Sequence, residues 1–196
     1  MEDYNKIIES LGIKFLKSNN IKVSNDFTIT DYEETENTIL ILKKGTIKFG
    51  KEHEELKEGH ALFIPAGRFT PLSFGNVNEK SPKLNLEEFG FKQTEFFKTS
   101  RSEDLTTVPV ADFTSIVFEA KVFDTVNFFT ALDIPAFSLE NSKVNNIIYE
   151  VIKEQETEEE GFQRVVKIKS ELMVVEVIRH ILKHRLFVEQ MATNST

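Results

Sequence analysis

A series of short apolar runs separated by glycine and proline, spanning residues 45–76, constrains the fold more than any other feature. Gly45 is followed by a short alternating segment, and Gly59 leads into the apolar run 61–64, which stops at the Pro-Ala-Gly turn 65–67. Proline cannot donate to a sheet ladder and glycine tolerates positive φ, so such residues end one strand and turn the chain into the next. Short strands with turns at this spacing predict a small β-barrel or sandwich.

The same stretch carries a family resemblance. Segment 59–70, Gly-His-Ala-Leu-Phe-Ile-Pro-Ala-Gly-Arg-Phe-Thr, resembles the second conserved motif of cupins, which is a glycine, five residues, Pro-x-Gly, two residues and usually a histidine. Thr70 stands where the metal-binding histidine would be, and His60 stands where the family usually has aspartate. The first cupin motif, with its paired histidines and glutamate, is not recognisable.

A metal-free cupin followed by helices resembles the N-terminal effector-binding and dimerisation domain of AraC-type transcription regulators. The resemblance implies an α+β fold, with a cupin-like β-barrel of the jelly-roll type followed by two α-helices, the second long and at a dimer interface. It also implies a cytoplasmic bacterial regulator that binds a small effector in the barrel.

The composition of the chain argues against several other classes of protein. The chain has 196 residues, of which 40% are hydrophobic and 29% charged, as expected of a globular protein with one well-buried domain. A formal net charge of -8 argues against nucleic-acid binding over the whole surface, because phosphate contacts need clustered lysine and arginine. The absence of cysteine excludes disulfides, thiolate metal sites and a cysteine nucleophile. No apolar run approaches the roughly 20 residues of a membrane span.

Hydrophobic periodicity predicts the elements of the N-terminal part. Residues 4–18 have apolar side chains at helical spacing, and 38–49 reads as a hairpin turning at Gly45. The charged segment 52–58 is expected to form an exposed edge strand. Further strands are expected at 69–74, 84–97 and 115–123, with 99–112 as a surface loop and the segment up to 139 as a connector.

Two helices are predicted to close the chain. Asn141 or Ser142 is a suitable N-cap for a helix that ends in the acidic run 155–160, and a second helix is expected over 162–188. We expect residues 1–135 to form the N-terminal helix and barrel, 136–190 a helical dimerisation subregion, and 191–196 a tail.

Metal chemistry finds little support in the sequence. The chain has four histidines, and His180 and His184 have the i, i+4 spacing that can bind zinc. Lys183 and Arg185 flank that pair, and histidines near a helix C-terminus more often offset the helix dipole. We therefore expect no metal, no cofactor and no catalytic residue.

A barrel without metal can still act as a container, because alternate strand residues line its interior. The plainer alternative is an interior filled by side chains, with Arg68 as an ordinary loop residue. An arginine at the mouth of a cavity could pair with a carboxylate or phosphate of a ligand. The residues expected to line the interior and mouth are Ile47, Phe49, Leu62, Ile64, Arg68, Thr70, Phe118 and Val122.

The second helix has an apolar surface too broad for one packing partner, so we expect a homodimer. The expected interface residues are Leu172, Val175, Ile178, Arg179, Leu182 and Leu186. DNA is expected to be bound only through a helix-turn-helix region, which residues 191–196 cannot hold, so the chain would be a truncated regulator or a standalone relative.

Two rival functions stay open at this stage. One is a metal-dependent cupin enzyme of the isomerase or dioxygenase kind, and the other is a standalone dimerisation module without a ligand.

Overall fold

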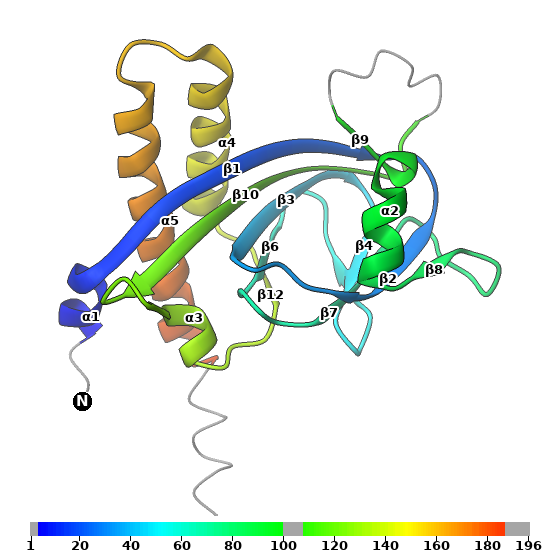
Figure 1. Ribbon diagram of the computed structural model, residues 1–196, viewed down its shortest axis with the longest axis horizontal. Coiled ribbons are helices and arrows are strands. Elements are labelled where there is room, and N and C mark those ends of the chain that lie inside the picture. Colours follow the sequence, from blue (N-terminus) through cyan, green and yellow to red (C-terminus); the bar gives the residue numbers. More distant parts are fainter. Residues whose placement is uncertain (1–3, 100–107, 187–196) are drawn as a thin grey trace, which may run out of the picture.

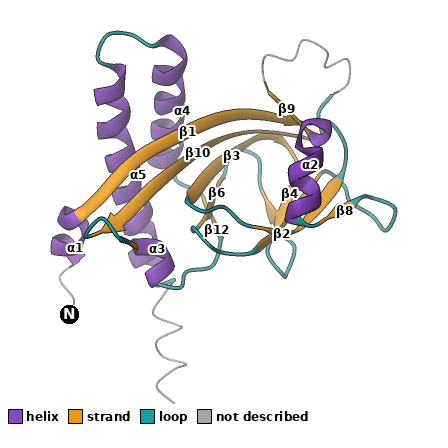
Figure 2. Ribbon diagram, viewed as in Figure 1, coloured by secondary structure: helices purple, strands orange, loops and turns teal. Residues whose placement is uncertain are grey.

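The computed structural model describes residues 4–99 and 108–186. Within them the fold is α+β, with two mainly antiparallel β-sheets packed face to face and a pair of long helices on the outer face of the larger sheet (Figure 1). Figure 2 shows that the strands occupy the middle of the molecule, with the long helices on one side and the helix of residues 86–96 on the other.

The larger sheet has the strand order β12-β6-β3-β10-β1-β9, with β11 paired to β10. Its long central strands are antiparallel neighbours, which pair from Leu11 opposite Val122 to Val23 opposite Ala111. The bounds are β1 Leu11–Val23, β3 Asn37–Gly45, β6 Ala61–Ile64, β9 Phe97–Thr99, β10 Ala111–Val122, β11 Val126–Asn127 and β12 Phe137–Leu139.

The smaller sheet has the order β5-β4-β7-β2-β8, and all its pairs are antiparallel except β2 with β8. The charged strand β5 lies at its edge, as the sequence predicts. The bounds are β2 Phe27–Tyr32, β4 Ile47–Phe49, β5 Glu54–Leu56, β7 Thr70–Phe74 and β8 Lys83–Leu84.

The prediction of a closed barrel is wrong for the described residues. The edge strands of the larger sheet form no ladder with those of the smaller sheet, so the two sheets remain a sandwich. The predicted hairpin over 38–49 is also absent, because β3 belongs to the larger sheet and β4 to the smaller one. The chain passes between the sheets at Gly45, whose φ is 96°.

Replacing Gly45 by alanine should destabilise the protein far more than replacing Gly50. A Cβ on Gly45 would lie 2.2 Å from the backbone oxygen of Val110, which is held in place by the Thr46 N–H. Gly50 also has positive φ, at 77°, but a Cβ there meets nothing within 4 Å. We expect Gly50→Ala to cost about 1 kcal/mol and Gly45→Ala at least about 2 kcal/mol more. Urea denaturation of both variants measures the difference, and equal losses would contradict this account of the crossing.

Five helices complete the described residues: α1 Tyr4–Ser10, α2 Leu86–Phe96, α3 Phe128–Ala131, α4 Ser142–Thr157 and α5 Phe162–His184. The predicted helix over 4–18 ends at Ser10, because the chain from Leu11 onward pairs with β10 instead. The predicted strand over 84–97 is mostly helix α2, which Asn85 caps by accepting from the Glu88 N–H at 2.8 Å. In the expected loop 99–112, residues 100–107 lie outside the described part, and β10 begins at Ala111.

The last two helices form as predicted. Asn141 caps α4 by accepting from the backbone N–H groups of Lys143 and Val144 at 3.0 and 3.2 Å. Val144, Ile147, Ile148, Val151 and Ile152 are all buried. Strand β12, which lies beyond the expected boundary at residue 135, pairs with β6. The two expected subregions therefore share one sheet and one core.

The sandwich separates two apolar cores. One lies between the outer face of the larger sheet and helices α3, α4 and α5, and it contains Ile39, Phe63 and Phe118. The other lies between the two sheets and beside α2, where Phe27 and Phe74 are among its members. Strand alternation places neighbouring residues of β3, β6 and β10 in different cores.

Candidate functional site

A cavity of about 330 Å³ lies in the second core, between the inner face of the larger sheet, the smaller sheet and α2. Three cross-strand rows of the larger sheet form one wall, because alternate residues of β1, β10 and β3 face inward. The rows are Lys17–Val117–Thr38, Asn19–Ser115–Leu40 and Ile21–Phe113. Their polarity falls from the first row to the last.

Aromatic rings dominate the apolar end. Phe97 lies with its ring centroid 5.4 Å from that of Phe74, 5.0 Å from that of Phe89 and 5.7 Å from that of Phe113. All four residues line the cavity, and Leu72, Leu86 and Gly90 line it with them. Edge-on ring contacts of this kind are rigid and apolar, so this end suits the apolar body of a ligand.

The polar end is formed by the loop between β2 and β3 together with the first cross-strand row. The Tyr32 hydroxyl donates to the Glu34 carboxylate at 2.8 Å. Burial raises the pKa of Tyr32 well above its ordinary value, and the nearby Glu34 charge and this hydrogen bond raise it further. The phenol therefore stays protonated and acts as a donor at neutral pH. Glu33 lines the same end of the cavity.

Seven of the described residues have a buried polar side-chain atom without a hydrogen-bond partner, and Thr38 is the one among them that lines the cavity. Its side chain is 4% exposed and lines the cavity, yet its hydroxyl has no hydrogen-bond partner among the described residues. A buried polar group without a partner costs about 1–3 kcal/mol, and such groups are rare in folded proteins.

The Pro-Ala-Gly turn of the cupin-like segment supports this polar end. The Gly67 N–H donates to the Glu34 backbone oxygen at 2.9 Å. The Ala66 N–H donates to the Asn37 side chain at 3.0 Å, and the Thr130 hydroxyl donates to the Ala66 carbonyl at 2.8 Å. The motif recognised in the sequence thus fixes the loop that carries the cavity's carboxylates.

The residues predicted to line a cavity lie elsewhere. Ile47, Phe49, Leu62 and Ile64 are buried in the core between the sheets, but they do not line the cavity. Thr70 is buried in β7 opposite Tyr32, and Arg68 forms an ion pair with Asp133.

Phe118 and Val122 lie on the opposite face of β10 and pack in the core against the helices. On β10 both faces are apolar enough to be buried, and the more apolar one, with Ile116 and Phe118, packs against the helices. The other face of β10, which includes Ser115, lines the cavity. The sequence shows the alternation, but only the pairing of β10 with β1 and β3 shows which face encloses a space.

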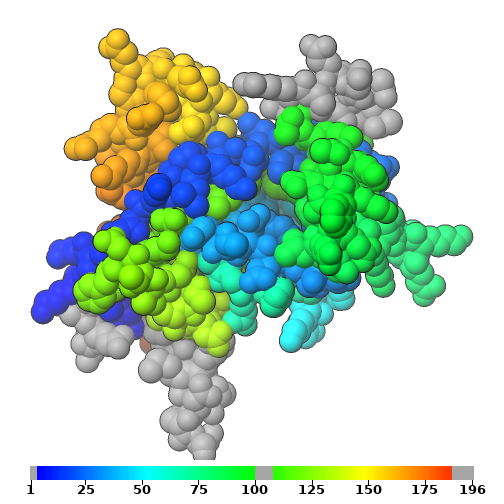
Figure 3. Space-filling view, in the orientation of Figure 1, coloured from blue at the N-terminus to red at the C-terminus, as the bar shows by residue number. Residues whose placement is uncertain are grey.

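Of the further hollows in the described part of the chain, two lie beside the helical pair and are open to the surface. The larger, of about 850 Å³, lies between the start of β1 and the ends of α4 and α5 that meet at their turn, and charged side chains line much of it. Its Lys121 is already paired with Glu36 and Glu119. Figure 3 shows the surface of β1 running uncovered between the helical pair and α2. We favour the smaller cavity because its apolar and polar ends are separated and partly enclosed.

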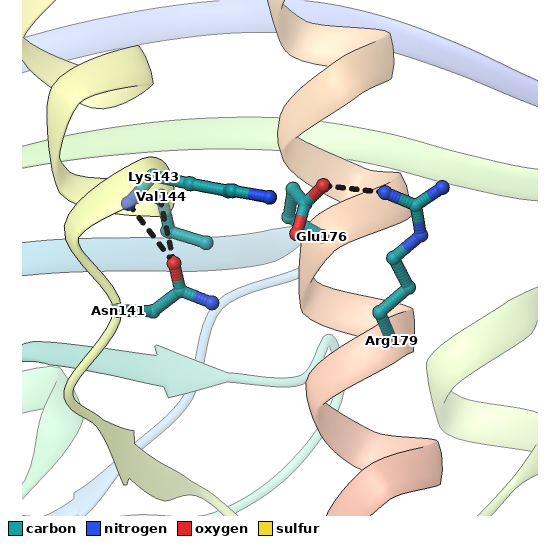
Figure 4. Close-up of polar contacts among 5 residues, drawn as sticks. All are labelled: Asn141, Lys143, Val144, Glu176 and Arg179. Carbon is teal, nitrogen blue, oxygen red and sulfur yellow. Dashed lines mark hydrogen bonds and ion pairs between the residues drawn. The ribbon is translucent and has the colours of Figure 1, made fainter.

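The other hollow lies where α4 begins beside α5 (Figure 4). Its polar groups largely satisfy one another, since Asn141 caps α4 and Glu176 pairs with Arg179 at 2.7 Å. His180 and His184 lie here with ring centroids 4.2 Å apart. In the described part of the chain, no three histidine, aspartate or glutamate side chains are grouped closely enough to hold a metal ion.

Protonation of His180 should weaken the fold. Burial lowers the pKa of His180 below its ordinary value of about 6.5, and the positive charges of His184 and Lys183 lower it further. The neutral ring, stacked on Phe137, is therefore the folded form, and its contribution is fully present above about pH 6.5 and declines as pH falls. Denaturation at about pH 8 and about pH 5 should show a smaller acid loss for His180→Gln than for the wild type. Equal losses would contradict the assignment.

The exposed side of α5 carries a regular apolar stripe. Ile168 is 54% and Leu172 47% exposed, and the stripe continues at alternating spacings of three and four residues. Its members are Val165, Ile168, Leu172, Val175, Leu182 and Leu186, with Arg179 interrupting it. Of the predicted interface residues, Ile178 is 2% exposed and belongs to the core between the larger sheet and the helices, and Leu182 and Leu186 are partly buried and pack against that core as well.

Among the described residues, no helix has both the length and the apolar character needed to cross a membrane. No protein-family model matches the sequence, and no curated protein matches it. Among solved structures, the fold is similar to that of apo ToxT K231A from Vibrio cholerae strain SCE256, with a TM-score of 0.43 and 8% identity. The likeness covers 87% of this chain and 56% of that one, so this chain spans little more than half of that neighbour's length. At this level the neighbour assigns no function.

Proposed function

We propose that this chain is the ligand-sensing and dimerisation domain of an AraC-type bacterial transcription regulator, and that its effector binds between the two sheets. The observation that carries the proposal is the cavity, which joins an aromatic end to a polar end with an unpartnered, buried Thr38 hydroxyl. The cupin-like segment 59–70 followed by two helices supports this class of regulator by resemblance, and the segment lies against the loop that forms the polar end.

The stripe on α5 supports pairing with a second copy. Spacings of three and four residues bring apolar side chains to one side of a helix, as in a coiled-coil seam. Burying large aliphatic side chains such as Ile168 and Leu172 would stabilise a dimer by about 25 cal/mol per Å² of apolar surface removed from water. A second α5 packed along the same stripe would bury them.

Strand β1 connects the cavity with the helices. Asn19 faces the cavity, whereas the amide of the next residue, Asn20, donates to the Glu156 carboxylate of α4 at 2.9 Å. A ligand can shift a regulator only by binding one arrangement of these elements better than another. We propose that effector binding favours one position of β1, and that α4 and α5 transmit this conformational change to the dimer interface.

We propose a binding role rather than a catalytic one. The metal-dependent cupin enzyme would need three or more ligands around an open position. No observation in the described residues favours that alternative, since Thr70 replaces the expected histidine and is buried within β7.

A reporter fusion tests the proposal. The chain is joined to a DNA-binding domain that occupies its operator only when another domain dimerises it, and reporter output is measured with and without a metabolite extract. We expect operator occupancy with the wild type, its loss in Leu172→Asp, and a change with extract that Ser115→Phe abolishes by filling the cavity. Occupancy unaffected by Leu172→Asp would overturn the pairing surface, and an extract response retained in Ser115→Phe would overturn the cavity.

A further inference from the structure

We infer that the cavity between the sheets selects a small cationic amphiphile, an apolar body that carries one protonated amine. This inference rests on the proposed function, because it names the chemical class of the effector in the same cavity. It depends on three properties of the described residues: the separation of polar and apolar ends, the charge of the polar end, and the unpartnered Thr38 hydroxyl.

Because one end of the cavity is apolar and the other is polar, we expect an amphiphilic ligand. The row Ile21–Phe113 and the rings of Phe74, Phe89 and Phe97 form one end, and they offer a ligand no charge. At about 30 Å³ for each water molecule, a space of about 330 Å³ holds roughly ten molecules of that size. That suits a single ring or a short alkyl chain with a head group.

The charge of the polar end favours a cation. Two carboxylates, Glu33 and Glu34, line it against one ammonium group, that of Lys17. Within the described part of the chain, no hydrogen bond or ion pair engages the side chain of Glu33 or that of Lys17. The Lys17 side chain is exposed, so its charge can turn toward water. Arg68, the residue expected to anchor an anion, is paired with Asp133 and does not line the cavity.

The hydrogen-bonding groups at this end also favour a donor. Carboxylates only accept hydrogen bonds, and Glu34 already accepts one from Tyr32. No group among the described residues donates to the Thr38 hydroxyl, which can accept a hydrogen bond from a ligand once its side chain rotates toward the cavity. An ammonium group offers three donors to the Glu33 and Glu34 carboxylates, whereas a carboxylate in the same place would face two like charges.

Three matched probes test the inference by calorimetry: phenylethylamine, phenylpropionate and phenylethanol, which share a ring but differ in the charge of the head group. We expect the amine to bind at least about tenfold more tightly than the anion, a difference of about 1.4 kcal/mol. Glu33→Gln should weaken the amine by about tenfold while leaving phenylethanol unchanged. Thr38→Val should weaken the binding of phenylethylamine and of phenylethanol, which can both donate to a hydroxyl. Glu52→Gln, at an exposed site outside the cavity, should leave the affinity of every probe unchanged.

The outcomes separate this inference from the proposed function. The preference for a cationic head group would be contradicted if phenylpropionate bound as tightly as the amine, or if Glu33→Gln left the affinity for the amine unchanged. Neither result would contradict the proposal that the cavity binds a ligand. Failure of the amine to bind would also overturn the inference, and the proposed function would then be judged by its reporter. Circular-dichroism melting of each variant shows that the comparisons are made on folded protein.

Discussion

Replacing Ile178 by aspartate should unfold the protein rather than separate two copies of it. Ile178 is 2% exposed and packs in the core between α5 and the outer face of the larger sheet. Aspartate would leave a carboxylate without a partner in that core and would remove the packing of the isoleucine, so we expect a loss on the order of 4 kcal/mol or more. The far-ultraviolet circular dichroism spectrum and the urea midpoint measure the loss.

Leu172→Asp is the matched control on the same helix. Leu172 is 47% exposed, so the change should cost the single chain less than about 1 kcal/mol while placing a charge in the proposed seam. Sedimentation equilibrium should then give the mass of one chain for Leu172→Asp and twice that mass for the wild type. A folded, dimeric Ile178→Asp protein would contradict the assignment of α5's two sides.

Replacing Phe27 by alanine should remove about 4 kcal/mol of stability, a value typical of a fully buried phenylalanine. The Phe27 ring is fully buried, with its centroid 4.2 Å from that of Phe96 and 5.1 Å from that of Phe74. Phe89 packs against it as well, so the change should also loosen α2 and the aromatic end of the cavity.

Phe91 on α2 provides the comparison, because it is 85% exposed. Phe91→Ala should leave the urea midpoint almost unchanged and can even raise helix propensity. Losses of similar size in the two variants would contradict the placement of α2 against the second core.

The elements that the sequence predicts best are those with strong local signals. α4 has an asparagine N-cap and five apolar residues at helical spacing, and all five are buried. β5 is short and charged, and it lies at a sheet edge as expected. In these segments local propensity and tertiary packing favour the same structure.

The elements that the sequence misassigns are those in which the two disagree. Residues 11–18 have a helical pattern but pair with β10. The long ladder with β10 stabilises this segment more than a short isolated helix would, because such helices are marginal in water. For α2, the sequence does hold a usable signal. Asn85 followed by Glu88 three residues later is a helix-start pattern, and the loose apolar alternation over 84–97 concealed it.

The candidate site was predictable only in outline. The cupin-like segment correctly marks a structural turn near it, through the contact of Gly67 with Glu34. The lining residues depend on strand register, since a shift of one residue exchanges the two faces of β10. Apolarity alone predicts that the face with Ile116 and Phe118 encloses the cavity, but that face packs against the helices. The face with Phe113, Ser115 and Val117 lines the cavity instead.

A melting-temperature screen tests the central claim, that the cavity between the sheets binds a small molecule. The wild type and Ser115→Phe are screened against a library of small metabolites at saturating concentration. Ser115 is 5% exposed and lies mid-wall in the cavity, so phenylalanine there should fill it. A ligand that binds only the folded state raises the melting temperature. We predict that at least one compound does so in the wild type and not in Ser115→Phe, whereas compounds that stabilise both proteins equally, or none that stabilises the wild type, would contradict the claim.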